Sequence, residues 1–138
     1  MPVNALQRQE LKIDSEDDVV VVRRRVKAFA QERHFDTFAV AAVTTATSEL
    51  TRNAWTHGGG GIATIEVVTD GSRIGIRVQF RDEGPGIADL ARVFEGGYST
   101  AQSLGLGLSG SRRLVDEFSI ASEVGRGTTI TIIKWKPF

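Results

Sequence analysis

One stretch of the chain reads ELTRNAWTHGGGG, residues 49–61, and ends a long helical pattern in four consecutive glycines. We expect a helix over about residues 36–55, which the glycines terminate. Glu49, Asn53 and His57 follow one another at four-residue intervals. They form one polar line along this helix, which is either a solvated stripe or part of a ligand site.

Patterns for two more helices and five strands surround this stretch. The helices are expected at residues 19–33 and about 106–118, and the strands at residues 11–13, 62–69, 73–81, 119–124 and 128–135. Turn residues at 70–72 and 125–127 predict two hairpins. The chain is therefore expected to be one α+β domain over residues 1–138, a two-layer sandwich with about three helices on one face of a mostly antiparallel sheet.

The helical patterns also predict which faces are buried. In the first helix the apolar positions at helical spacing are Val22, Val26, Phe29 and Ala30, and the outward positions are Arg23, Arg24, Arg25 and Lys27. In the long helix the expected apolar stripe contains Phe38, Ala42, Thr45 and Leu50. The basic run is either a solvated face or a surface for docking a partner.

Composition excludes several classes of function. Lys plus Arg and Asp plus Glu number 17 each, so no excess positive charge is available for nucleic acid. No cysteine is present, which excludes disulfides and thiolate chemistry and suits a reducing compartment. No apolar run approaches the roughly 20 residues that cross a bilayer. We expect a cytoplasmic protein with no membrane or nucleic-acid partner.

Three glycine-containing motifs follow the first stretch. Residues 82–87 read DEGPGI and place Asp82 at a strand end, before glycines that allow close approach of a ligand; a plain acidic turn is the alternative. Residues 105–108 read GLGL and open the expected third helix, where free N–H groups can hold phosphate. Residues 125–129 read GRGTT, and alone they indicate a hairpin turn.

The order of these four motifs resembles that of the GHKL superfamily of ATPases and kinases, and the resemblance extends over residues 49–129. It implies a Bergerat-type ATP-binding fold that uses ATP and Mg²⁺. By this resemblance Asn53 is the Mg²⁺ ligand, Asp82 accepts the adenine amino group, and Thr128 lines the adenine. The base pocket then contains Gly84, Gly86 and Ile87, and the phosphate loop contains Gly105, Leu106, Gly107 and Leu108.

Two polar residues of the long helix keep alternative roles. We interpret Glu49 as the catalytic base, because it lies one helical turn before the Mg²⁺ ligand and can orient a hydroxyl or water toward the terminal phosphate. The alternative for Glu49 is a supporting contact that positions His57 or a water. His57 either faces phosphate or caps the helix before the glycines.

A narrower resemblance covers nearly the whole chain. Chain length and residues 97–118 are similar to those of the switch kinases of the bacterial stressosome (the RsbT type), which are related to the anti-sigma-factor serine kinases. This resemblance implies a protein serine/threonine kinase that phosphorylates Ser or Thr on a STAS-domain partner in bacterial stress signalling. It also implies a downstream phosphatase or similar output protein as a second partner.

The expected ATP lid departs from the family pattern. No Lys or Arg occurs from Val93 through Ser111, whereas related lids often carry a cation near Gln102. The charge of the γ-phosphate would then be offset by Mg²⁺, backbone N–H groups, Arg52 or the substrate protein. Ser99 and Thr100 offer hydroxyls to the phosphates, although any mobile loop contains such residues.

The sequence also bears on three functions other than the kinase. A module that binds partners according to its ATP state, without useful phosphotransfer, is the main alternative. We do not expect a histidine-kinase catalytic domain, because no dimerisation helices with an acceptor histidine precede the motifs. A gyrase-like or chaperone-like ATPase is not expected either, because no transducer domain follows Phe138.

Overall fold

The computed structural model describes residues 2–87 and 99–137, with the backbone alone for residues 99–106. In chain order the elements are β1 (Asn4–Ile13), α1 (Asp18–Glu32), α2 (Thr37–Thr56), β2 (Gly61–Thr69), β3 (Ile74–Asp82), α4 (Ser99–Leu114), β4 (Glu117–Glu123) and β5 (Gly127–Trp135). None of the helices described is long and apolar enough to span a bilayer.

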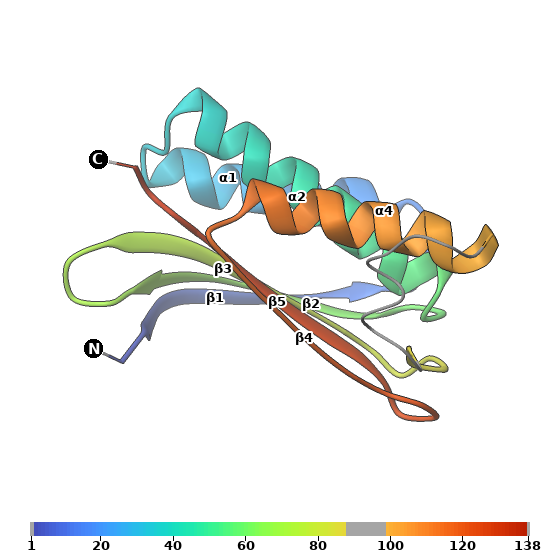
Figure 1. The fold of residues 1–138 in the computed structure, drawn as a ribbon. Helices are drawn as coiled ribbons and strands as arrows, with labels where there is room; N and C mark the ends of the chain where they lie inside the picture. Colours follow the sequence, from blue (N-terminus) through green and yellow to red (C-terminus); the bar gives the residue numbers. More distant parts are fainter. Residues whose placement is uncertain (1, 88–98, 138) are drawn as a thin grey trace.

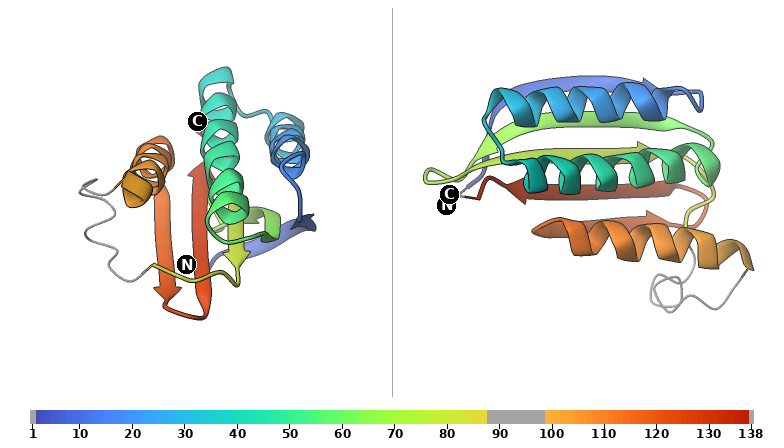
Figure 2. Two further views of the ribbon diagram at one scale, coloured as in Figure 1. Left: turned by 90° about the vertical axis from the view of Figure 1, so that its right-hand side faces the viewer. Right: turned by 90° about the horizontal axis from the view of Figure 1, so that it is seen from above.

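The strands form one antiparallel sheet in the order β1-β2-β3-β5-β4. The three helices of the described residues lie on one face of this sheet and leave its other face uncovered (Figure 1). From above, α1 lies over the β1 side, α2 over the middle and α4 over the β4 side (Figure 2). The α+β sandwich expected from the sequence is confirmed.

Strand register gives the sheet two distinct ends. At one end, Gly61 of β2 pairs with both Ile13 and Asp82, and Asp82 also pairs with Thr128. At the other end β1 begins and β5 finishes, and the N and C labels of Figure 1 lie on that side. The end that contains Asp82 is therefore remote from both chain termini.

Helix α2 packs across the middle of the sheet, and its buried face differs from the expected one. Asp36 caps the helix by accepting a hydrogen bond from the Ala39 N–H at 2.7 Å. The apolar side chains buried along it are those of Ala39, Val40, Val43, Ala46, Leu50 and Ala54. Phe38, expected in this stripe, is 88% exposed. The buried positions are mostly small residues, which let α2 approach the sheet closely and leave the large Phe38 outside the contact.

Several element boundaries also differ from the sequence prediction. Strand β1 starts at Asn4 instead of Leu11, because an edge strand is held by backbone pairing and needs few apolar side chains. Helix α4 begins at Ser99 and ends at Leu114, whereas the prediction was about 106–118. Phe118 belongs to β4 and packs against the core from that strand.

The buried face of α2 gives a stability prediction. Leu50 is completely buried, so Leu50→Ala should lower the free energy of unfolding by roughly 2–5 kcal/mol through lost apolar contact and a cavity. Phe38→Ala should change it by no more than about 0.5 kcal/mol, because an exposed side chain loses little on truncation. Urea unfolding followed by circular dichroism measures both, and an equal loss in the two variants would contradict this packing.

Candidate active site

Asp82 ends strand β3 in a position where glycines crowd its carboxyl group. Its Oδ1 accepts a hydrogen bond from the Gly84 N–H at 3.0 Å. A Cβ atom at Gly58 would collide with the Asp82 carboxyl, and a Cβ at Gly127 would collide with the Asp82 main-chain oxygen. Gly127 also has φ +102°, which side chains rarely adopt. Positions 58 and 127 beside this acid therefore require glycine, because neither has room for a Cβ and position 127 has a positive φ.

Partial burial raises the pKa of Asp82 above its ordinary value, because desolvation disfavours the charged carboxylate. Backbone hydrogen bonds from Gly84 and Thr128 act in the opposite direction and do not cancel the effect. The folded protein therefore binds the proton of this group more tightly than the unfolded chain does. This acid lowers stability as pH rises through its folded pKa, and a ligand that donates a hydrogen bond to it would offset the cost.

The segment after Asp82 is fixed to the β4–β5 hairpin by hydrogen bonds. The Ile87 N–H donates to Ser122 Oγ at 2.7 Å, and the Ser122 and Thr128 hydroxyls are 2.7 Å apart. Gly86 has φ +76°, and a Cβ there would collide with the main-chain oxygen of Glu123. Gly86, Ile87 and Thr128 are therefore brought together as expected. Ser122, which joins them, was missed because a serine in an alternating strand gives no signal in the sequence.

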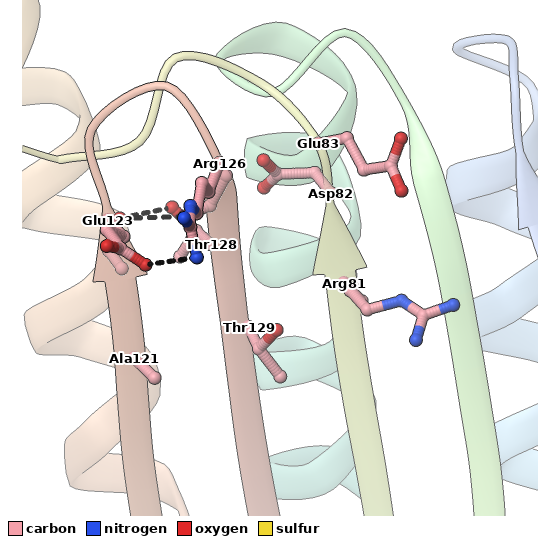
Figure 3. Close-up of a pocket in the computed structure, with 10 residues that line it drawn as sticks. Arg81, Asp82, Glu83, Ala121, Glu123, Arg126, Thr128 and Thr129 are labelled. Atoms are coloured by element: carbon pink, nitrogen blue, oxygen red, sulfur yellow. Dashed lines mark hydrogen bonds and ion pairs between the residues drawn. The ribbon is translucent and has the colours of Figure 1, made fainter.

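A pocket of about 510 Å³ opens at these strand ends (Figure 3). Its lining comes from the end of β3, the end of β4 and the start of β5. The lining residues are Arg81, Asp82, Glu83, Ala121, Ser122, Glu123, Arg126, Gly127, Thr128 and Thr129. Arg81 and Thr129 alternate with the core residues Phe80 and Ile130, so the pocket opens on the face of the sheet that the described helices leave uncovered. Asp82 and Thr128, the two residues expected at the adenine, pair with each other and direct their side chains to the opposite, helix-covered face.

A second group of polar atoms lies where α2 faces α4. A Cβ atom built on Gly107 would be 3.2 Å from Asn53 Nδ2 and 3.5 Å from Glu49 Oε2. Asn53 Nδ2 is buried and has no hydrogen-bond partner among the described residues. A buried amide without a partner is costly unless a ligand or water satisfies it. Glu49, Asn53 and Gly107 thus form a polar corner in which the Asn53 amide nitrogen has no partner among the described residues.

Gly58 connects the polar corner to Asp82. Its N–H donates to the main-chain oxygen of Asn53 at 3.3 Å, and its Cα region packs against the Asp82 carboxyl. The two groups therefore belong to the same end of the molecule. Gly58 was not predicted as a site residue, although its place as the first glycine after the helix was a usable signal.

The roles left open for His57 and Glu49 can now be compared with their contacts. His57 caps α2, with its N–H donating to the Asn53 oxygen at 2.9 Å, which agrees with the capping alternative. Glu49 Oε1 accepts a hydrogen bond from Arg52 Nη1 at 3.0 Å. Its observed partner is therefore Arg52, and not the His57 that the supporting role had suggested.

The expected phosphate loop has a different backbone setting. Gly105 and Gly107 were expected to open a helix, but α4 begins six residues before Gly105, so the two glycines lie inside it. The run STAQSL before Gly105 contains good helix formers, which explains the earlier start. Leu108 is fully buried in the core, which leaves only its backbone for a ligand. The side chains of residues 99–106 lie outside the description, Ser99, Thr100 and Leu106 among them.

Known proteins resemble this chain in sequence and in fold. Residues 39–137 match the family described as histidine kinase-, DNA gyrase B- and HSP90-like ATPase. The chain is 44% identical over 125 residues to the serine/threonine-protein kinase RsbT of Bacillus subtilis, covering 91% of this chain and 94% of that protein. It is 31% identical over 119 residues to an anti-sigma F factor of Thermoanaerobacter sp., covering 82% of each.

Solved structures agree with the fold. The crystal structure of the RsbU and RsbW domains of Rv1364c from Mycobacterium tuberculosis superposes with a TM-score of 0.67 at 22% identity, covering 95% of this chain and 33% of that one. The SiaB–SiaC complex from Pseudomonas aeruginosa gives a TM-score of 0.54 at 13% identity, covering 95% and 90%. At these identities the likeness concerns the fold alone.

The chain therefore belongs to the histidine kinase-, DNA gyrase B- and HSP90-like ATPase family and, within it, to the serine/threonine-protein kinases. Members of this class use ATP, so the two connected groups at one end of the sheet are the candidate site for a nucleotide. Asp82, Thr128 and their glycines form one part of the site. Glu49, Asn53 and Gly107 form the other.

The polar corner gives a prediction about Gly107. Gly107→Ala should weaken ATP binding by roughly tenfold or more, because the added methyl group fills the space beside Asn53 and Glu49. Folding should not suffer, since alanine is favoured over glycine in a helix by about 0.5–1 kcal/mol. Gly110→Ala is the matched control, because a Cβ there has nothing within 4 Å. Isothermal titration with ATP distinguishes them, and equal affinities would contradict the assignment.

Asp82 gives a prediction with opposite signs for binding and stability. Asp82→Asn removes a partly buried charge, so the nucleotide-free protein should melt at a higher temperature at pH 7, and this gain should shrink as pH falls toward 4. Loss of the charged acceptor should weaken ATP binding by roughly 10–100-fold. Thermal melts and nucleotide titrations from pH 4 to 8 test both. Unchanged ATP affinity would show that Asp82 does not bind the adenine.

Proposed function

We propose that this chain is a protein serine/threonine kinase that uses Mg-ATP to phosphorylate Ser or Thr on a STAS-domain partner, as a regulatory switch in bacterial stress signalling. The proposal is carried by the polar corner, where a carboxylate and an unsatisfied amide face a glycine on the neighbouring helix. Similarity to a serine/threonine-protein kinase over nearly the full length of both chains supports it.

The adenine would lie at the ends of the strands. Asp82 would accept a hydrogen bond from its amino group, and Thr128, which pairs with Asp82 on the neighbouring strand, would lie beside the base. Gly84, Gly86 and Ile87 would form the neighbouring part of the base pocket, with the Ile87 side chain packed against the core and its N–H bound to Ser122. Partial desolvation of Asp82 supports this assignment, because a buried acceptor gains most from a donor supplied by a ligand.

The triphosphate would extend from the base, beside Asp82 and Gly58, toward α2 and α4. Asn53 is the proposed Mg²⁺ ligand, and its amide fits this role because its oxygen suits a hard cation and its nitrogen has no partner among the described residues. Bound Mg²⁺ would offset the charge of the phosphates. Gly105, Leu106, Gly107 and Leu108 would contact the phosphates through their backbone once the first turns of α4 unwind, because N–H groups inside a helix already bond to the preceding turn. Ser99 and Thr100 would add hydroxyls, and His57 would lie beside them.

Glu49 would act as the general base. Its carboxylate takes the proton from the partner's Ser or Thr hydroxyl while that oxygen bonds to the γ-phosphorus. The bond between the γ-phosphorus and the β–γ bridging oxygen breaks, and ADP leaves with that electron pair. The 43% exposure of the Glu49 side chain is consistent with this role, because a protein substrate must reach the carboxylate from solvent.

The partners follow from the same proposal. A STAS-domain protein presents the acceptor hydroxyl, and a downstream phosphatase or similar output protein receives the signal. Both would meet the kinase in the cytoplasm.

A second candidate function is an ATP-dependent anti-sigma or switch module that binds its partner without significant phosphotransfer. Two observations favour it. The anti-sigma F factor of Thermoanaerobacter sp. is 31% identical to this chain over 82% of its length, and residues 93–111 contain no Lys or Arg that could stabilise the transferred phosphoryl group.

Phosphotransfer decides between the two functions. Incubation of the protein with γ-labelled ATP, Mg²⁺ and a purified STAS-domain protein should label the partner on Ser or Thr. Glu49→Ala should reduce the labelling rate about 10²–10⁴-fold and leave ATP binding nearly intact, because only the base is removed. Asn53→Ala should reduce both labelling and Mg-dependent ATP binding.

The control is the partner itself, with its acceptor hydroxyl residue changed to Ala. Tight ATP binding together with ATP-dependent capture of an unlabelled partner would refute the kinase and establish the binding module.

A further inference from the structure

We propose that Arg52 is a positioning residue that holds the Glu49 carboxylate in the orientation needed for proton abstraction. This inference rests on the proposed function, since it concerns the same base. Arg52 lies three residues after Glu49 on α2, so both side chains emerge on adjacent turns of one helix face.

The two oxygens of Glu49 have different neighbours. Oε1 accepts a hydrogen bond from Arg52 Nη1 at 3.0 Å. Oε2 lies 3.5 Å from the place of a Cβ on Gly107, which is on the side of Asn53 and the polar corner. The ion pair therefore engages one carboxylate oxygen and directs the other toward the space where the reacting groups would meet.

A glutamate at this place needs such a contact. The side chain of Glu49 is 43% exposed and has three rotatable bonds, so in the absence of a partner its carboxylate would sample many orientations in water. Misplacing a catalytic group by about 1 Å can cost on the order of 10²-fold in rate. Arg52 comes from the same helix, so the orientation exists before any substrate binds.

The ion pair is a poor source of stability, which separates its positioning role from a structural one. Both side chains are nearly half exposed, and exposed pairs at this spacing contribute little to folding. Arg52→Gln should therefore fold as well as the parent protein. Arg8 is a matched control, because it also forms an exposed ion pair with a glutamate, at 2.7 Å to Glu10, on the open side of the sheet.

The test compares phosphotransfer and nucleotide binding in the full chain with a STAS-domain protein as substrate. Arg52→Gln should lower kcat roughly 10–100-fold while the KM for ATP and the Kd for ATP stay within about twofold. Arg52→Lys should recover part of the lost rate, because a lysine can still pair with Glu49. Arg8→Gln should have the parent's kcat. In a Glu49→Ala background, Arg52→Gln should have no further effect, since both act through one carboxylate.

Three results would overturn the assignment. If Arg52→Gln weakens ATP binding tenfold and leaves ADP binding unchanged, the guanidinium contacts the γ-phosphate instead. If it lowers kcat equally with and without Glu49, it acts independently of the base. If it keeps the parent's kcat, it has no role in the reaction. A parent protein that transfers no phosphate refutes the proposed function itself, an outcome distinct from these three.

Discussion

The contact between Gly58 and Asp82 is the constraint on which the site depends. It joins the end of helix α2 to the end of strand β3 with only the Asp82 carboxyl between the two backbones, and the Gly58 N–H also bonds to the Asn53 main-chain oxygen. A helix and a strand so closely packed cannot accept a larger residue at this point without moving apart. Glycine at position 58 therefore sets how near the acid of the strand lies to the amide of the helix, which a ligand that contacts both would require.

Much of the fold was accessible from the sequence because its signals were local. The two hairpins were predicted from their turn residues, and the first helix from the spacing of Val22, Val26 and Phe29, all buried in the structure. The sequence prediction was wrong where burial or strand pairing depends on residues far away in the chain. Phe38 was placed in the core on its hydrophobicity alone, and β1 was cut short because a strand held by backbone pairing carries no apolar signature.

The candidate site was predictable to a similar degree. The spacing of Glu49 and Asn53 placed both on one helix face, and the structure brings them to Gly107, which lies more than fifty residues away in sequence. Ser122 and Gly58 were missed, because a strand serine and the first of four glycines become significant only when the chain that packs on them is known. The sequence likewise could not predict which oxygen of Glu49 faces the site. Spacing alone puts Arg52 near Glu49 and does not say which oxygen it binds.

The position of the chain ends has a consequence for how this fold is used. Strand β1 starts and strand β5 finishes at the end of the sheet opposite Asp82 and Thr128, so polypeptide joined at either terminus would emerge away from the nucleotide site. Such a fold is suited to modular architecture, because extra domains can be added in tandem without obstructing catalysis. In the Mycobacterium tuberculosis structure the matching fold occupies 33% of a chain described as RsbU and RsbW domains, so this fold does occur joined to further polypeptide.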